Sequence, residues 1–223
     1  MGRLSTGALI ALAAWALTGC ADAYRWDKPT PNTYVVRPGD TLYNIAWRYG
    51  LDHRDIARWN SLGDGTLIQP GQQLKLAGSR ASPRSAAPPR PVARPAAPQA
   101  PPPEWRWPLR GPVIAAFGAD GGARTGVLIG AERGAAVHAA AAGRVVYAGS
   151  GLISFGQLLI VKHNETHLSA YGHNDTLLVA EGANVTAGQP IARVGLGPEQ
   201  QPALHFEIRA SGAPLDPLKL LPR

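Results

Sequence analysis

Cysteine is nearly absent from this chain, since Cys20 is the only one among 223 residues. A single cysteine excludes an intramolecular disulfide and any metal site built on a cysteine pair. Acidic residues are also scarce, with 15 Asp and Glu against 22 Lys and Arg, which gives a net charge of +7 and a pI near 10.0. This balance favours partners with anionic surfaces. The chain lacks a recognition helix and an aromatic-interleaved basic motif, so no nucleic-acid partner is expected.

The first 19 residues have the pattern of a cleaved export signal. Arg3 supplies a positive start, residues 9–17 form an apolar run too short to span a bilayer, and the letters LTGC end at Cys20. This end resembles the bacterial lipoprotein pattern, which implies that Cys20 carries acyl chains such as palmitate and anchors the protein in a membrane. Ala21 is not the Asp that implies retention in the inner membrane. The resemblance therefore implies the outer membrane of a Gram-negative cell, with the chain facing the periplasm and residues 20–33 as a lipidated tether.

Residues 34–76 are predicted to form a small βααβ domain. Apolar residues between positions 42 and 49 recur at the spacing of one helix face, with Asp40 or Thr41 as the cap and Gly50 as the stop. Asp52 can cap a second helix that continues to residue 59, and a Pro-Gly turn then leads into a final strand.

The same 43 residues resemble a LysM module, because they contain the runs YVVRPGDTL at positions 34–42 and IQPGQ at 68–72. LysM modules bind glycans that contain N-acetylglucosamine, in a shallow groove between two loops. The resemblance implies a groove formed by Gly39, Asp40, Thr41, Leu42, Ile68, Gln69 and Pro70. Backbone groups would bind the sugar, and Leu42 and Ile68 would add aliphatic contact. The alternative is that Leu42 and Ile68 are only core residues of a small domain.

Residues 77–104 have the composition of a spacer. Between positions 77 and 103 there are nine prolines, four arginines and no acidic residue. Such a segment cannot bury a core and favours extended polyproline conformations. We therefore expect a disordered linker between two modules with separate cores.

Residues 105–223 are predicted to form a mainly antiparallel β domain, which makes the whole chain α+β. Short alternating runs separated by Gly-rich turns predict strands at 144–148, 157–162, 167–171, 190–194 and 204–209. The runs AAAAGRVVYAG at 139–149, YGH at 171–173 and LHFEIR at 204–209 resemble the LytM (lysostaphin-type) metallopeptidases, whose fold is a duplicated hybrid motif. The resemblance covers about 119 residues.

The resemblance also shows which catalytic residues are missing. Active LytM members hold zinc with a His and an Asp four residues apart and with the second His of a His-x-His strand. The first two positions are Arg124 and Leu128 here, and Ala203 replaces the first His of the strand, so that His205 alone remains. A catalytic zinc needs three protein ligands, so the resemblance implies a domain without metal, cofactor or peptidase activity. His163 and His167 are four residues apart but flank a turn, and we expect them at surface strand ends.

The former metal cleft is expected to serve as a binding groove for a protein partner. Alternate residues of a strand share a face, so Ala203 and His205 should point away from the core that holds Leu204 and Phe206. If the segment before position 128 is extended as well, the side chains of Arg124 and Leu128 also lie on that face. The expected groove, on an exposed face, consists of Arg124, Leu128, Tyr171, His173, Ala203 and His205.

The order of segments in this chain resembles that of the murein hydrolase activators. It consists of a lipoprotein signal, a LysM module, a spacer and a LytM domain that lacks its catalytic residues. The resemblance implies an outer-membrane lipoprotein that binds peptidoglycan and activates a periplasmic zinc amidase, an N-acetylmuramoyl-L-alanine amidase, for septal wall splitting and daughter-cell separation. Two alternatives stay open. One is a passive tether between wall and membrane, and the other is an active LytM-type endopeptidase with altered ligands.

Overall fold

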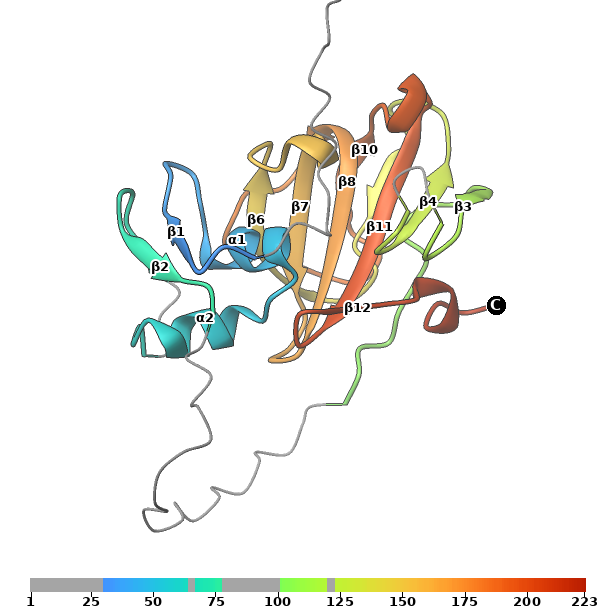
Figure 1. Cartoon of the computed structure of the whole chain (residues 1–223). Coiled ribbons are helices and arrows are strands. Elements are labelled where there is room, and N and C mark those ends of the chain that lie inside the picture. Colours follow the sequence, from blue (N-terminus) through green and yellow to red (C-terminus); the bar gives the residue numbers. More distant parts are fainter. Residues whose placement is uncertain (1–29, 64–66, 78–100, 120–122) are drawn as a thin grey trace, which may run out of the picture.

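A computed structural model describes residues 30–63, 67–77, 101–119 and 123–223. The predicted signal peptide, Cys20, most of the tether and most of the linker lie outside the described residues. Within them, no helix is both long enough and apolar enough to cross a membrane. The described residues form a small βααβ unit and a larger β unit (Figure 1).

The small unit has the order and the caps predicted from the sequence. It contains β1 (Thr33–Val35), α1 (Leu42–Tyr49), α2 (His53–Trp59) and β2 (Gln73–Lys75), and β1 pairs antiparallel with β2. The Thr41 side chain accepts a hydrogen bond from the Asn44 N–H, while Gly50 ends α1 in the left-handed conformation at φ 64°. Asp52 caps α2. The apolar faces of both helices close a core with the two strands.

The large unit is an antiparallel sheet that curls around its own core. Its main path runs β3-β4-β11-β8-β7-β6-β9, β10 pairs with β5 and β8, and β12 pairs with β11. The strands are β3 (Val113–Ala115), β4 (Val127–Gly130), β5 (Ala136–His138), β6 (Gly143–Gly149), β7 (Gln157–Lys162), β8 (His167–Leu177), β9 (Asn184–Val185), β10 (Pro190–Val194), β11 (Ala203–Ala210) and β12 (Ala213–Leu215). Three short 3-10 turns, η1 (Ile153–Phe155), η2 (Pro198–Gln200) and η3 (Pro217–Lys219), complete it. All five predicted strands are present, and β8 extends six residues further than predicted.

The two faces of β11 differ as the alternation predicted. Leu204, Phe206 and Ile208 point into the main core of the β unit. His205, Glu207 and Arg209 lie on the other face, yet all three are at most 1 % exposed. The prediction of an exposed face was therefore wrong, because something covers it.

At Arg209 the cover is the small unit, whose α1 packs against the outer face of the sheet (Figure 1). Tyr43 and Trp47 of α1 share an apolar cluster with residues of β6, β7, β8 and η1: Tyr147, Leu152, Phe155, Leu158, Ile160, Leu168 and Ala170. The prediction of two separate cores is incomplete, since each unit has its own core and a third core lies between them.

Candidate functional site

The loops of the predicted LysM groove are shaped by local hydrogen bonds. The Asp40 carboxylate accepts from the Tyr34 hydroxyl at 2.6 Å and from the Arg37 N–H at 2.8 Å, which fixes the first loop. The Gln72 side chain accepts from the Gln69 N–H at 3.0 Å and fixes the second. Gly39, Gln69 and Pro70 are exposed, so their backbone groups are accessible to a ligand.

The aliphatic contacts of this groove differ from the prediction. Leu42 is fully buried in the core of the small unit, so its side chain cannot contact a sugar and the core interpretation holds for it. Ile68 is half-buried, packs against that core and also reaches the surface. Its neighbour Leu67 is 85 % exposed, and sequence reasoning missed it. A large apolar residue in a polar loop was the signal that could have identified it.

Two positions of the expected groove lie side by side, one on β4 and one on β11. Leu128 of β4 lies opposite His205 of β11, and a Cβ added to Gly126 would be 3.1 Å from His205 Nε2. His205 Nε2 is 3.3 Å from a Glu207 carboxylate oxygen, to which the Thr125 hydroxyl also donates at 3.1 Å. His205 therefore has a carboxylate partner within its own strand.

These residues do not fit a zinc ion. Leu128 and Ala203 offer no donor atom, and Arg124 would bring a positive charge toward the cation. Among the described residues, no three His, Cys, Asp or Glu side chains converge in a way that could hold a metal. The site therefore differs from that of a zinc peptidase in the types of its side chains and not only in their positions.

The floor of the predicted groove is closed. Ala203 and His205 are at most 1 % exposed, and Leu128 is 4 % exposed. Phe155 of η1 packs against the two histidines, with its ring 5.0 Å from that of His205 and stacked at 6.5 Å on that of His173. Only Arg124 of the predicted set is exposed, and it lies in a turn before β4 instead of on a strand.

Tyr171 and His173 are two positions apart in β8, but their side chains lie on opposite sides of the sheet, because the positive φ of 62° at His173 interrupts the strand alternation. Burial, together with the nearby His205, lowers the pKa of His173 to about 4, so this imidazole is neutral at neutral pH. Tyr171 was wrongly placed in the groove, because its side chain is fully buried in the main core. Its hydroxyl accepts from the Ala140 N–H at 2.8 Å, and burial raises its pKa to about 12.

A buried polar chain connects the former metal site to the small unit. Arg209 Nε donates to a Glu207 carboxylate oxygen at 2.6 Å, and the Arg209 guanidinium lies 3.8 Å from the centre of the Trp47 ring. Arg209 also donates to the Trp47 carbonyl at 3.0 Å. The two units are therefore joined by polar as well as apolar contacts at the edge of the closed groove.

Comparisons with known proteins match both modules and most of the chain. The LysM domain profile matches residues 34–77, and that of Peptidase family M23 matches residues 122–217. The Lipoprotein NlpD/LppB homolog of Pseudomonas aeruginosa is 40 % identical over 232 residues, which cover 87 % of this chain and 78 % of that protein. The uncharacterized lipoprotein YgeR of Escherichia coli is 37 % identical, covering 92 % and 88 %. The Murein hydrolase activator NlpD of Salmonella typhimurium is 35 % identical, covering 86 % and 68 %.

Proposed function

The chain belongs to the NlpD/LppB family of lipoproteins, and from this membership we propose that it activates a wall-cutting enzyme without cutting the wall itself. The protein binds peptidoglycan through its LysM domain. It switches on a periplasmic zinc amidase that removes stem peptides from the glycan during septal wall splitting and daughter-cell separation. Support comes from the LysM match and from a relative that is named a murein hydrolase activator.

One observation carries this proposal. Two of the three positions that would hold zinc in an active peptidase are Arg124 and Leu128, and Ala203 replaces a catalytic His, yet the domain keeps a complete fold with a buried core. A fold retained without its metal ligands is expected where the domain binds a partner instead of catalysing a reaction.

Activation is a shift between two states of the amidase. The activator binds the open form more tightly than the closed form, and the population follows the difference in affinity. A tenfold activation needs only about 1.4 kcal/mol of differential binding. One exposed cation at the right place can supply much of this, because hydrogen bonds between guanidinium and carboxylate are strong and directional.

The amidase contacts the rim of the closed groove. Arg124 is exposed there, whereas the groove floor around His205 lies under Phe155. The rim therefore offers a charged group to a carboxylate or to helix-end carbonyls of the partner.

The anchor sets where this contact takes place. Acyl chains on Cys20 hold the mature chain to the outer membrane, residues 20–33 form the tether, and residues 77–104 form the spacer before the domain at 105–223. Passive tethering alone would need only the lipid and the LysM domain, so an assay of amidase activation distinguishes the two roles.

The test is dye release from labelled peptidoglycan. We expect no release by this protein alone, slow release by a periplasmic amidase of the same cell, and at least a tenfold faster release by both together. Release by this protein alone would establish an endopeptidase. If the mixture released dye no faster than the amidase alone while wall binding was intact, the passive tether would be the remaining function.

A further inference from the structure

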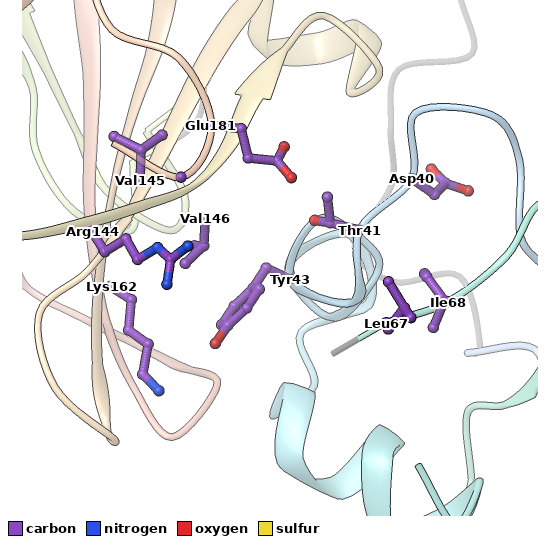
Figure 2. A pocket seen from close by; sticks show the side chains of 11 residues that line it. Asp40, Thr41, Tyr43, Leu67, Ile68, Arg144, Val145, Val146, Lys162 and Glu181 are labelled. Atoms are coloured by element: carbon purple, nitrogen blue, oxygen red, sulfur yellow. The ribbon is translucent and has the colours of Figure 1, made fainter. Parts of the chain in front are cut away.

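An opening between the two units lies next to the LysM loops. It is a cavity of about 610 Å³, with Thr41, Leu67 and Ile68 on one wall and Arg144, Lys162 and Glu181 on the other (Figure 2). Tyr43 of α1 forms part of its floor, and the same residue belongs to the core between the units. The packing between the two units thus also places the sheet beside the predicted glycan site.

The LysM wall suits a sugar ring. Leu67 is 85 % exposed and Ile68 is half-buried, so both present apolar surface to the cavity. The adjacent loop backbone, fixed by the Asp40 carboxylate, offers hydrogen-bonding groups. Apolar contact combined with a few fixed polar groups is the usual composition of a small-ligand site.

The opposite wall carries two cations in adjacent positions. Arg144 of β6 and Lys162 of β7 are directly paired in register, so their side chains lie on the same face and close together (Figure 2). Like charges directly opposite each other in a sheet are destabilising. The exposed Glu165 pairs with Lys162 at 2.7 Å, but no ion pair links Arg144 to any of the described residues. An anionic ligand would offset this repulsion.

We propose that the cavity binds one segment of peptidoglycan on both walls, with the LysM loops holding an N-acetylated sugar and Arg144, beside Lys162, holding a carboxylate attached to that sugar. This inference rests on the proposed peptidoglycan binding and makes it specific for acidic glycan. A planar guanidinium binds a carboxylate through two parallel hydrogen bonds, which favours Arg144 as the main contact. Glu181 at the cavity edge can accept from an amino group of the same ligand.

The carboxylate has two sources in the wall polymer. It is either the lactyl group of the sugar, which is free only after the peptide has been removed, or an acid group of the stem peptide. Neutral N-acetylglucosamine oligomers have neither. Titration calorimetry with the full chain in detergent distinguishes these cases. It compares the binding of three ligands: the neutral oligomers, peptide-free glycan strands and peptide-bearing strands.

We expect the wild-type chain to bind one of the two acidic ligands roughly tenfold more tightly than the neutral oligomer, with a preference that weakens as salt is raised. Preference for the peptide-bearing strand identifies the stem peptide, and preference for the peptide-free strand identifies the lactyl group. Arg144→Gln should remove the preference and leave binding of the neutral oligomer unchanged. Arg106→Gln is the matched control, because Arg106 is exposed outside the cavity.

Two results would overturn the proposal. One is equal binding of all three ligands by the wild-type chain, and the other is a preference that survives Arg144→Gln. Either leaves LysM glycan binding intact. Failure of the wild-type chain to bind any of the three ligands would instead reject the proposed wall binding together with this inference.

Discussion

Arg209 carries a positive charge that is almost completely removed from water. Its side chain is 1 % exposed, and Glu207, the acid that pairs with it, is fully buried. Breaking a buried ion pair by removing one partner leaves an uncompensated charge and typically costs about 3–5 kcal/mol. We therefore expect Glu207→Ala to lower the free energy of unfolding by about that amount in urea denaturation. Glu165→Ala removes a carboxylate that is 75 % exposed and should cost less than about 1 kcal/mol. Equal losses in the two variants would contradict the role of this buried pair.

Arg124 is the residue with which the proposed amidase contact can be tested alone. Arg124→Glu reverses the charge of an exposed side chain in a turn, so the fold should persist while activation falls at least tenfold. Dye release with the amidase, combined with a thermal melt of the variant, measures both. Arg106→Glu makes the same charge change elsewhere on the surface and should activate normally. Full activation by a folded Arg124→Glu protein would place the contact outside the groove rim.

Leu128 cannot serve as a second probe of that contact. At 4 % exposure its side chain is buried, and an Asp placed there would bury an unpaired charge. Leu128→Asp should therefore unfold the β unit, and its loss of activity would carry no information about the partner.

At the scale of elements, the histidine that follows β7 is half-buried and makes a hydrogen bond through each ring nitrogen. His163 was expected at a surface strand end. It does follow β7 directly, but its ring bridges the Ala142 carbonyl and the Ser169 hydroxyl at 2.7 Å each. The Trp105 ring packs edge-on against it at 4.9 Å. Burial lowers the pKa of His163 from 6.5 to about 4.

This lowered pKa predicts how stability depends on pH. Between pH 6.5 and about 4 the unfolded chain binds a proton at His163 that the folded chain does not, so stability falls as pH decreases through this window. Above pH 6.5 the contribution of His163 to the free energy of unfolding is constant. His163→Gln should reduce the slope of the unfolding free energy against pH by the equivalent of up to one bound proton. Urea denaturation at a series of pH values measures this slope. His53 and His173, whose pKa values are also lowered to about 4, keep part of the slope in both proteins. An unchanged slope would show that His163 titrates normally.

At the scale of the whole molecule, the contact between the two units depends on a glycine. Gly212, in the turn between β11 and β12, has φ 82°, and a Cβ added to it would lie 2.7 Å from the backbone of Leu51 and Asp52 in the small unit. Gly212→Ala should push the units apart and increase the radius of gyration in small-angle X-ray scattering. Gly188 has a similar φ of 80° but no atom within 4 Å of its added Cβ. Gly188→Ala therefore brings the same backbone strain without the clash and should keep the compact form. Identical scattering from both variants would argue against this contact.

The anchor is tested on the intact cell. Cys20→Ser removes the thiol that would be acylated, and the apolar run before it is too short to span a bilayer. We expect the variant in the soluble periplasmic fraction and the wild-type protein in the outer membrane. Recovery of the variant with the outer membrane would show that another feature anchors the chain.

The local elements and the identity of the two modules were determined by the sequence alone. Helix caps at Thr41, Gly50 and Asp52 act over two to four residues, and alternation along β11 assigns its core face, so short-range patterns suffice for both. The loss of two zinc ligands at Arg124 and Leu128 and of a catalytic His at Ala203 was also evident from the sequence, because it concerns residue types.

Only the tertiary structure decided which surfaces are open. Trp47 and Arg209 are 162 positions apart, and neither shows a local signal that they stack. Their contact places α1 on the outer face of the sheet and brings Arg144 beside the LysM loops, while Phe155 closes the former metal groove. Burial of this kind depends on which distant segments meet, and strand alternation can say that two faces differ but not what covers the second one.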